Sequence, residues 1–331
     1  MEENTGKNEL SLRPSLIADF VGQKNKVENI RTYVKGARLR NEALDHILLH
    51  GPPGLGKTTL AHIVAAEMKV DISQTSGPVL EKKGDLTAIL TDLKAHDVLF
   101  IDEIHRIRTS LEEILYKAME DYQIDIVIGQ GVGAKTITID LQPFTLIGAT
   151  TRAGLISSPL RDRFGITLRL DLYPESDLQQ IVLRNARILE IQISDDMAAT
   201  IAGRSRGTPR IANTLLKRIR DFAQVKGRGI IDQEISQMAF KALGIDREGL
   251  DELDRKILLT IIEKFAGGPV GLSTLATAIH EEKETIEDVY EPYLVQRGYI
   301  KVTKQGRVAT RRALEYFQGD LRYERKTLFE K

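Results

Sequence analysis

The first half of the chain alternates short apolar runs with amphipathic stretches. The clearest apolar runs are Ile47–Leu49, Val98–Ile101 and Phe144–Ile147. Each has the length of a buried strand, and the stretches between them space their apolar residues as helices do. This alternation predicts a parallel, doubly wound α/β sheet up to about Leu172.

The rest of the chain, from about Tyr173, has mainly helical spacing. Amphipathic runs as far as Leu243 predict a small helical lid. Beyond Leu253 the pattern predicts three helices and a short hairpin, which together make a winged helix. These elements are expected at residues 253–265, 272–279, 284–296 and 299–310, with the hairpin turning at Gly306.

One segment interrupts the sheet pattern. Residues Ile124–Leu141 alternate apolar and polar side chains around a glycine-rich turn at 129–133, which predicts a β-hairpin. The turn is similar to a dinucleotide-binding fingerprint, but no helix follows it, so that interpretation fails. Ile126 and Ile128 lie on the apolar face of this hairpin. That face either packs on the body of the domain or binds a partner.

Length and pattern together predict a chain of several domains. At 331 residues it is too long for a single core. We place a large α/β domain with a P-loop parallel sheet at 1–172 and a small helical lid domain at 173–245. A C-terminal winged-helix domain is expected at 246–331.

The amino-acid composition excludes several kinds of site. The chain has no cysteine, which excludes disulfides, zinc–thiolate sites and cysteine nucleophiles and suits a reducing cytoplasm. Its six histidines show no metal-ligand spacing. The polar N-terminus and the lack of a long apolar stretch argue against export and against a membrane span. The 47 basic and 47 acidic residues cancel, so net charge does not indicate a nucleic-acid partner.

A glycine-rich loop follows the first apolar run. Residues 51–59 read GPPGLGKTT, the pattern of a loop that binds a nucleotide triphosphate between a strand and a helix. Gly54 and Gly56 leave room for backbone N–H groups around the β-phosphate, and the helix N-terminus favours an anion. We expect Lys57 to reach the β- and γ-phosphates and Thr58 to bind Mg²⁺. Thr59 is placed for a contact to the α-phosphate.

Two carboxylates end the second apolar run. The segment FIDE places Asp102 and Glu103 at the carboxyl end of a buried strand, where ligands bind in open α/β sheets. Asp102 can hold the Mg²⁺ shell there, and Glu103 can orient and polarise the attacking water of ATP hydrolysis. Because acidic residues in this place are also common helix caps, the assignment depends on the phosphate loop beside it.

Several motifs occur in the order that is typical of one protein family. GPPGLGKTT, FIDEIHR, GATTRAG, SPLRDRFG and RSRGTPRIAN, followed by GGPVGL and EPYL, are similar to the RuvB family of Holliday-junction branch-migration ATPases in the AAA+ superfamily. The similarity runs from about Leu12 to Phe317. It implies a cytoplasmic homohexameric ring with a DNA-binding head domain, which uses ATP and Mg²⁺ to move double-stranded DNA at a four-way junction. RuvA would bind the hairpin at 124–141, and the RuvC resolvase is a further implied partner.

The same resemblance implies contacts to the nucleotide that spacing does not indicate. They are Leu12, Arg13 and Tyr173 at the adenine and ribose, with Glu120, Asp121 and Tyr122 near the nucleotide.

Three more residues have a functional interpretation, and for two of them a purely structural role is also open. Thr151, after the third apolar run, could hold the water or the γ-phosphate as sensor 1, or it could cap a strand. Arg163 could act as an arginine finger on a neighbouring subunit's γ-phosphate. Arg161 is the alternative finger, and an ion pair with Asp162 is the plain role for Arg163. Arg210 opens a lid helix and could fold over the γ-phosphate of its own subunit as sensor 2.

Charge is uneven within the winged helix. From Arg297 to Arg312 there are six basic residues and no acidic one, whereas Glu281–Glu291 holds six acids and one lysine. Because carboxylates repel phosphates, we expect the wing to contact the DNA backbone without reading sequence, and a solvated basic face is the alternative. Relatives carry arginine where this chain has Val302 and Gln305. The expected DNA contacts are therefore Lys301, Lys304 and Arg307.

Three other functions fit parts of the sequence. A clamp-loader subunit shares the ATPase motifs but is not expected to carry a winged helix. A GTPase would need an N-K-x-D motif after the phosphate loop, and the nearest match, at 25–28, precedes the loop and lacks the aspartate. An ATP-gated transcription factor would read a defined site through its recognition helix, which the acidity of this helix disfavours.

Overall fold

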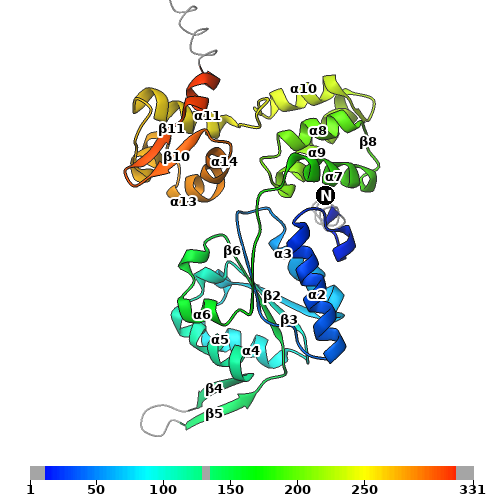
Figure 1. The fold of residues 1–331 in the computed structure, drawn as a ribbon, viewed down its shortest axis with the longest axis vertical. Helices are drawn as coiled ribbons and strands as arrows, with labels where there is room; N and C mark the ends of the chain where they lie inside the picture. The colour runs from blue at the N-terminus through cyan, green and yellow to red at the C-terminus, as the bar shows by residue number, and fades with distance from the viewer. Residues whose placement is uncertain (1–11, 129–134, 318–331) are drawn as a thin grey trace, which may run out of the picture. The chain divides into compact units, whose positions relative to one another are not determined.

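The computed structural model describes residues 12–128 and 135–317, which belong to two compact units, Met1–Tyr173 and Pro174–Lys331 (Figure 1). We describe each unit by itself. No helix in these described ranges has the length and apolar character needed to cross a membrane.

The first unit is built on a five-stranded parallel sheet with strand order β2-β3-β6-β1-β7. Its strands are β1 (Ile47–His50), β2 (Ile72–Ser76), β3 (Val98–Asp102), β6 (Thr145–Thr150) and β7 (Ile166–Arg169). The helices that accompany it are α2 (Lys24–Arg40), α3 (Lys57–Met68), α4 (Lys83–Asp92), α5 (Thr109–Asp121) and α6 (Ser158–Asp162). The predicted parallel α/β sheet is therefore confirmed.

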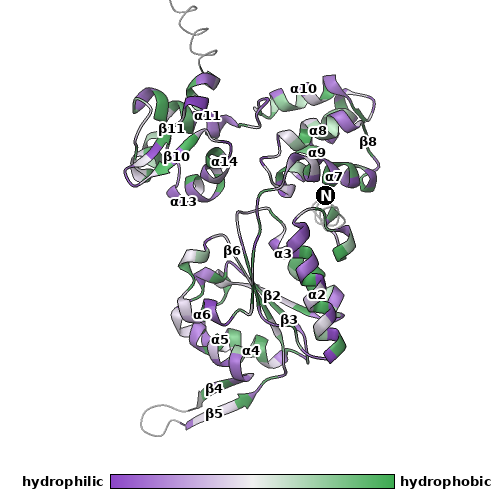
Figure 2. Ribbon diagram, in the orientation of Figure 1, coloured by the Kyte–Doolittle hydropathy of each residue, from purple (hydrophilic) through white to green (hydrophobic). Residues whose placement is uncertain are grey.

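Strands β1, β3 and β6 form the middle of this sheet; β1 and β3 are apolar up to their last residue, whereas β6 also contains two threonines and a glycine. Their side chains are nearly all buried, as in strands covered on both faces. The accompanying helices α2 and α5 carry both hydrophobic and hydrophilic residues (Figure 2). At the edges the pattern changes, since β7 alternates buried and exposed residues and β2 is only partly buried.

The predicted hairpin is formed by β4 (Gln123–Ile128) and β5 (Lys135–Asp140), which pair antiparallel. Its turn at 129–134 lies outside the described residues. Ile124 is buried in the core of the unit, and Ile126 packs partly against that core. Its cross-strand partner Ile137 is 48% exposed. The apolar face thus packs on the body at its base and is open to solvent further out.

The second unit contains a helical part and a winged helix. The helical part, which we call the lid, has α7 (Glu175–Ile188), α8 (Asp195–Gly203), α9 (Pro209–Lys226) and α10 (Gln233–Ala242). Two very short strands, β8 (Gln192–Ile193) and β9 (Ile230–Ile231), pair in parallel beside them and were not expected from the sequence. Ser194 and Asp232 cap α8 and α10 by accepting backbone N–H bonds, which fixes where these helices begin.

The winged helix, which we call the head, begins beyond residue 247. Its elements are α11 (Glu252–Leu259), a π-helical turn (Thr260–Lys264), α12 (Leu272–Ile279), α13 (Lys283–Thr285), a second π-helical turn (Ile286–Tyr290), α14 (Glu291–Gln296), β10 (Ile300–Thr303) and β11 (Gly306–Ala309). Leu258, Leu275 and Leu294 from successive helices are buried in one apolar core with Tyr299 and Phe317. The winged-helix prediction is confirmed.

Candidate nucleotide site and DNA interface

The glycine-rich loop joins β1 to α3, as the sequence predicts. Gly54 and Gly56 have φ angles of 80° and 94°, a left-handed conformation that side chains disfavour, and Gly56 is the N-cap of α3. Lys57 is buried, and its ammonium donates to the carbonyls of Gly51 at 2.8 Å and Pro52 at 3.0 Å. The ammonium therefore lies inside the loop, and Thr58 and Thr59 follow it on the first turn of α3.

Glu103 stands at the carboxyl end of β3 in an unusual backbone conformation. Its φ is 46°, in the left-handed region, and its N–H donates to Asp102 Oδ1 at 3.0 Å. Gly77 makes this turn possible, because a Cβ at that position would come within 2.4 Å of the Glu103 carbonyl oxygen. The chain thus tolerates a strained residue at the place where we expect catalysis.

Two neighbours hold the Glu103 carboxylate. Thr151, just beyond β6, donates its hydroxyl to Glu103 Oε2 at 3.4 Å, and His105 Nδ1 lies 3.2 Å from the same oxygen. His105 Nδ1 is also 2.8 Å from the Thr150 hydroxyl oxygen, which accepts the N–H of Arg152. A lone pair on Nδ1 would face a carboxylate oxygen, so we assign the proton to Nδ1.

His105 is the residue of this group that sequence reasoning missed. Its side chain is only 9% exposed, and it links the end of β3 to the end of β6 through Glu103 and Thr150. The available signal was its position two residues after Glu103. A search for metal-ligand spacing does not detect this signal.

The donor set fits a magnesium ion. Thr58 supplies a hydroxyl oxygen and Asp102 a carboxylate oxygen, the hard oxygen ligands that Mg²⁺ prefers alongside phosphate and water. In the sheet, β6 lies between β1 and β3, so the loop after β1 and the carboxylates after β3 share one edge. No group of three or more acidic or histidine side chains suited to a metal occurs in the described part of the chain.

Tyr173 is brought to the phosphate loop. Its side chain is buried, and its hydroxyl donates to the carbonyl of Leu55 at 3.3 Å. Leu12 is buried as well, whereas Arg13 is exposed. Of the three implied adenine and ribose contacts, Tyr173 thus has a direct contact with the loop.

Arg163 lies at the end of α6 and has partners on α5. Its guanidinium donates to Glu120 Oε2 at 3.0 Å and to the carbonyl of Pro159 at 2.7 Å, and lies 4.5 Å from the centre of the Tyr116 ring. The partner carboxylate is therefore Glu120, and the ion pair with Asp162 considered above is not its contact. These contacts fix where Arg163 points within its own subunit.

The structure gives different surroundings to Glu120, Asp121 and Tyr122. Glu120 pairs with Arg163, and Asp121 is exposed at the end of α5. The Tyr122 ring makes an edge contact with Phe144 at 5.9 Å between ring centres and packs on the core. Its ring therefore contributes to packing, which the resemblance did not suggest.

Arg210 is exposed on the first turn of α9, which begins at Pro209. Because it belongs to the second unit, its place relative to the phosphate loop stays a prediction.

The basic residues of the head are mostly neutralised by carboxylates. Arg307 and Glu291 are each only 12% exposed and form an ion pair at 2.8 Å. The other arginines of this stretch pair as Arg297 with Glu175 and Glu248, Arg311 with Glu315, and Arg312 with Glu248. The Arg307 guanidinium therefore holds the wing to α14, and its expected contact with DNA stays a prediction. Lys301 and Lys304 are exposed on the wing, and in residues 135–317 neither has an ion pair.

Comparisons with known proteins agree with this geometry. Three family profiles match consecutive parts of the chain. They are the Holliday junction DNA helicase RuvB P-loop domain at 12–170, the RuvB AAA lid domain at 173–246 and the RuvB C-terminal winged helix domain at 247–318. A curated relative, the Holliday junction branch migration complex subunit RuvB of Koribacter versatilis, is 57% identical over 316 residues, covering 96% of this chain and 88% of that protein.

Solved structures of similar proteins are also known. The Thermotoga maritima RuvB Holliday junction branch migration motor is 51% identical with a TM-score of 0.85, covering 93% of this chain and 98% of that one. A mutant of the same protein has a TM-score of 0.86 at the same identity and coverage. The profiles span nearly the whole chain and the curated relative exceeds half identity, and on these grounds the chain belongs to the RuvB family.

Proposed function

We propose that this protein is an ATP-driven DNA motor that moves four-way junctions by branch migration, as its relatives' names describe. It hydrolyses ATP with Mg²⁺, assembles as a homohexameric ring in the cytoplasm and acts with RuvA, with RuvC as a further partner. The observation that carries the ATPase assignment is the Glu103 carboxylate, held by Thr151 and His105 on the sheet edge that also carries the phosphate loop.

Each of the site residues has a separate role in ATP hydrolysis. Lys57 and the loop N–H groups hold the β- and γ-phosphates, and Thr58 and Asp102 would hold Mg²⁺, which neutralises phosphate charge when bound. Glu103 orients the attacking water and takes up its proton. The Thr151 hydroxyl donates to Glu103 Oε2, leaving the other carboxylate oxygen for the water. Arg210 would contact the γ-phosphate from the lid.

A direct assay tests this function. The protein should hydrolyse ATP, two sequence-unrelated duplexes should stimulate it alike, and with RuvA it should dissociate a synthetic four-way junction. Stimulation by one defined sequence alone would favour the ATP-gated transcription factor. If the protein hydrolysed no ATP with any of these DNAs, the proposal of an ATP-driven motor would be contradicted.

The open part of the hairpin is the proposed RuvA contact. Ile137→Glu should abolish RuvA-dependent loading on junctions and leave ATP hydrolysis unchanged, because a charge would be buried in an apolar contact. Ile128→Glu is expected to act in the same way. Thr136→Glu, on the opposite face of β5, is the matched control. Normal loading by Ile137→Glu would remove the hairpin from the interface; pull-down with RuvA and junction gel shifts provide the measurements.

Lys301 and Lys304 are the proposed phosphate contacts of the wing. Each change to alanine should weaken binding to unrelated duplexes equally and reduce the slope of log K against log salt by about one unit. Lys241→Ala removes an exposed cation from the lid and should leave the slope unchanged. Salt titrations on two duplexes decide this, and a loss confined to one sequence would contradict a backbone contact.

A further inference from the structure

Arg206 is a buried arginine in the loop between α8 and α9. It is 8% exposed and has a φ of 55°, so the backbone turns left-handed at a residue with a long side chain. The loop is ordered around it, since the Ser205 carbonyl accepts from the Thr208 N–H at 3.0 Å. Four positions after Arg206 comes Arg210, the proposed sensor 2 residue.

Within residues 12–128 and 135–317, the side chains that contact the Arg206 guanidinium lie in the head. It donates to Asp251 Oδ2 at 3.0 Å and to Asp254 Oδ1 at 2.7 Å, at the start of α11. The rings of Tyr290 and Tyr293 lie 4.9 and 5.1 Å from it, within cation–π range. A single lid side chain thus contacts the first and the last helical segments before the wing.

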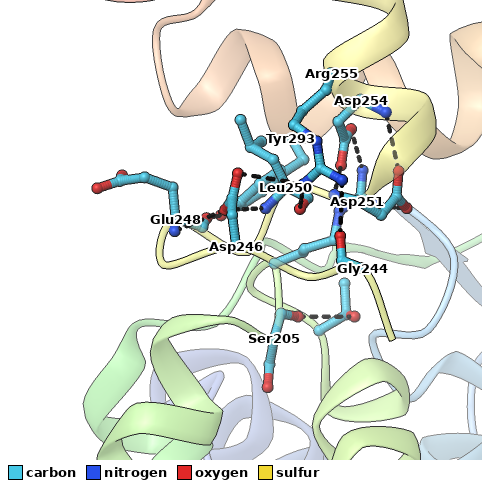
Figure 3. A network of polar contacts seen from close by, with 11 residues as sticks. Ser205, Gly244, Asp246, Glu248, Leu250, Asp251, Asp254, Arg255 and Tyr293 are labelled. Atoms are coloured by element: carbon cyan, nitrogen blue, oxygen red, sulfur yellow. Dashed lines mark hydrogen bonds and ion pairs between the residues drawn. The ribbon is translucent and has the colours of Figure 1, made fainter. Parts of the chain in front are cut away.

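The acceptors are fixed in turn. Asp251 and Asp254 cap α11 reciprocally, each side chain accepting the other's N–H, and Figure 3 shows both at the start of this helix. Asp254 is fully buried. Burial raises the pKa of its carboxyl to about 7, and the Arg206 guanidinium opposes that rise. Arg206 is therefore the largest influence that favours the charged form of Asp254, ahead of the Asp251 N–H bond.

The linker between lid and head is also held in place (Figure 3). Asp246 accepts the N–H groups of Glu248 and Leu250, and Arg255 donates to the carbonyls of Gly244 and Leu250. A flexible linker would not carry motion from one part to the other. These bonds make residues 244–250 a defined turn.

We propose that Arg206 is a positioning residue that joins the lid and the head into one body, so that movement of the Arg210 loop at the nucleotide reaches the DNA-binding wing. The inference rests on the proposed function, because it assumes that Arg210 responds to nucleotide and that the wing contacts DNA. Arg206 itself touches neither.

The test separates coupling from stability. Arg206→Met alone would leave the buried Asp254 carboxyl without its partner, and such a change commonly destabilises a fold. The variant of choice is therefore Arg206→Met with Asp254→Asn, which removes both charges and keeps side chains of similar size. Thermal unfolding shows whether it remains folded.

The double variant should hydrolyse ATP without DNA at a rate within about twofold of the parent and bind duplex DNA normally. Junctions moved per ATP hydrolysed should fall about tenfold, the upper part of the range for coupling residues. Arg218→Met with Asp221→Asn is the matched control, since it removes an ion pair of 3.2 Å that lies within α9 of the lid and should leave coupling intact. Parent-like coupling in a folded double variant would overturn the proposal.

A cross-link provides the decisive rescue. The chain has no cysteine, so Glu175→Cys with Arg297→Cys gives one reactive pair across the lid–head junction, where these side chains now form an ion pair at 3.4 Å. A bismaleimide across this pair should restore most of the coupling lost with Arg206. N-ethylmaleimide, which blocks each thiol separately, should restore none.

Failure of the complete cross-link to restore coupling would overturn the proposal, because Arg206 would then act within its loop alone. A parent protein that neither responds to DNA nor moves junctions would overturn the proposed function together with this inference. An active parent with a fully coupled variant would overturn the inference alone.

Discussion

Glu103→Gln should bind Mg-ATP as the parent does and lose turnover by at least about 100-fold. The amide has the shape of the carboxylate and can still accept the Thr151 hydroxyl, so the loop after β3 should keep its conformation. It cannot take up a proton from the attacking water. Nucleotide affinity measured by a fluorescent analogue and turnover measured by phosphate release separate the two effects.

Two variants serve as controls for this experiment. Glu113→Gln makes the same chemical change at an exposed position of α5 and should have the parent rate. Lys57→Ala should instead impair nucleotide binding itself, because the ammonium lies inside the phosphate loop. If Glu103→Gln released phosphate at the parent rate, another group would have to act as the base.

The apolar runs predicted the middle of the sheet because those strands are buried on both faces. β2 reads ISQTS and β7 reads ITLR, and neither has the continuous apolar run that predicts a buried strand. In the described sheet each lies at an edge beside a single strand, so its amino-acid composition is less restricted and indicates a strand less clearly. The two-residue strands β8 and β9 are shorter still, and their pairing depends on contacts far apart in sequence.

Site residues inside a motif were predictable, whereas their partners were not. The loop at 51–59 fixes Lys57 and Thr58 by spacing alone, and Glu103 follows from its place after a buried strand. The Arg307 pair with Glu291 joins residues 16 apart, and only the fold brings them together. A count of basic residues therefore does not reveal which of them are paired with carboxylates.

Arg163→Ala should leave each subunit's nucleotide affinity nearly unchanged and lower turnover by about 10³-fold or more, the magnitude of an arginine finger. Within its own subunit Arg163 is held by Glu120 and by the Tyr116 ring. These partners orient the guanidinium. Such an orientation is expected if Arg163 contacts the γ-phosphate in the nucleotide site of a neighbouring subunit. Arg161→Ala, which removes an exposed cation two residues earlier, is the matched control and also tests the alternative finger.

Mixing two inactive variants distinguishes a trans role from a local one. A ring of Arg163→Ala subunits lacks every finger, and a ring of Glu103→Gln subunits lacks every base. In a mixed ring, an Arg163→Ala subunit keeps its own Glu103 and can receive Arg163 from a Glu103→Gln neighbour, so that interface is complete. Turnover should therefore return in proportion to such interfaces and peak near equal amounts of the two variants. If verified mixed rings stayed inactive at every ratio, Arg163 would act only inside its own subunit, through Glu120 and α5.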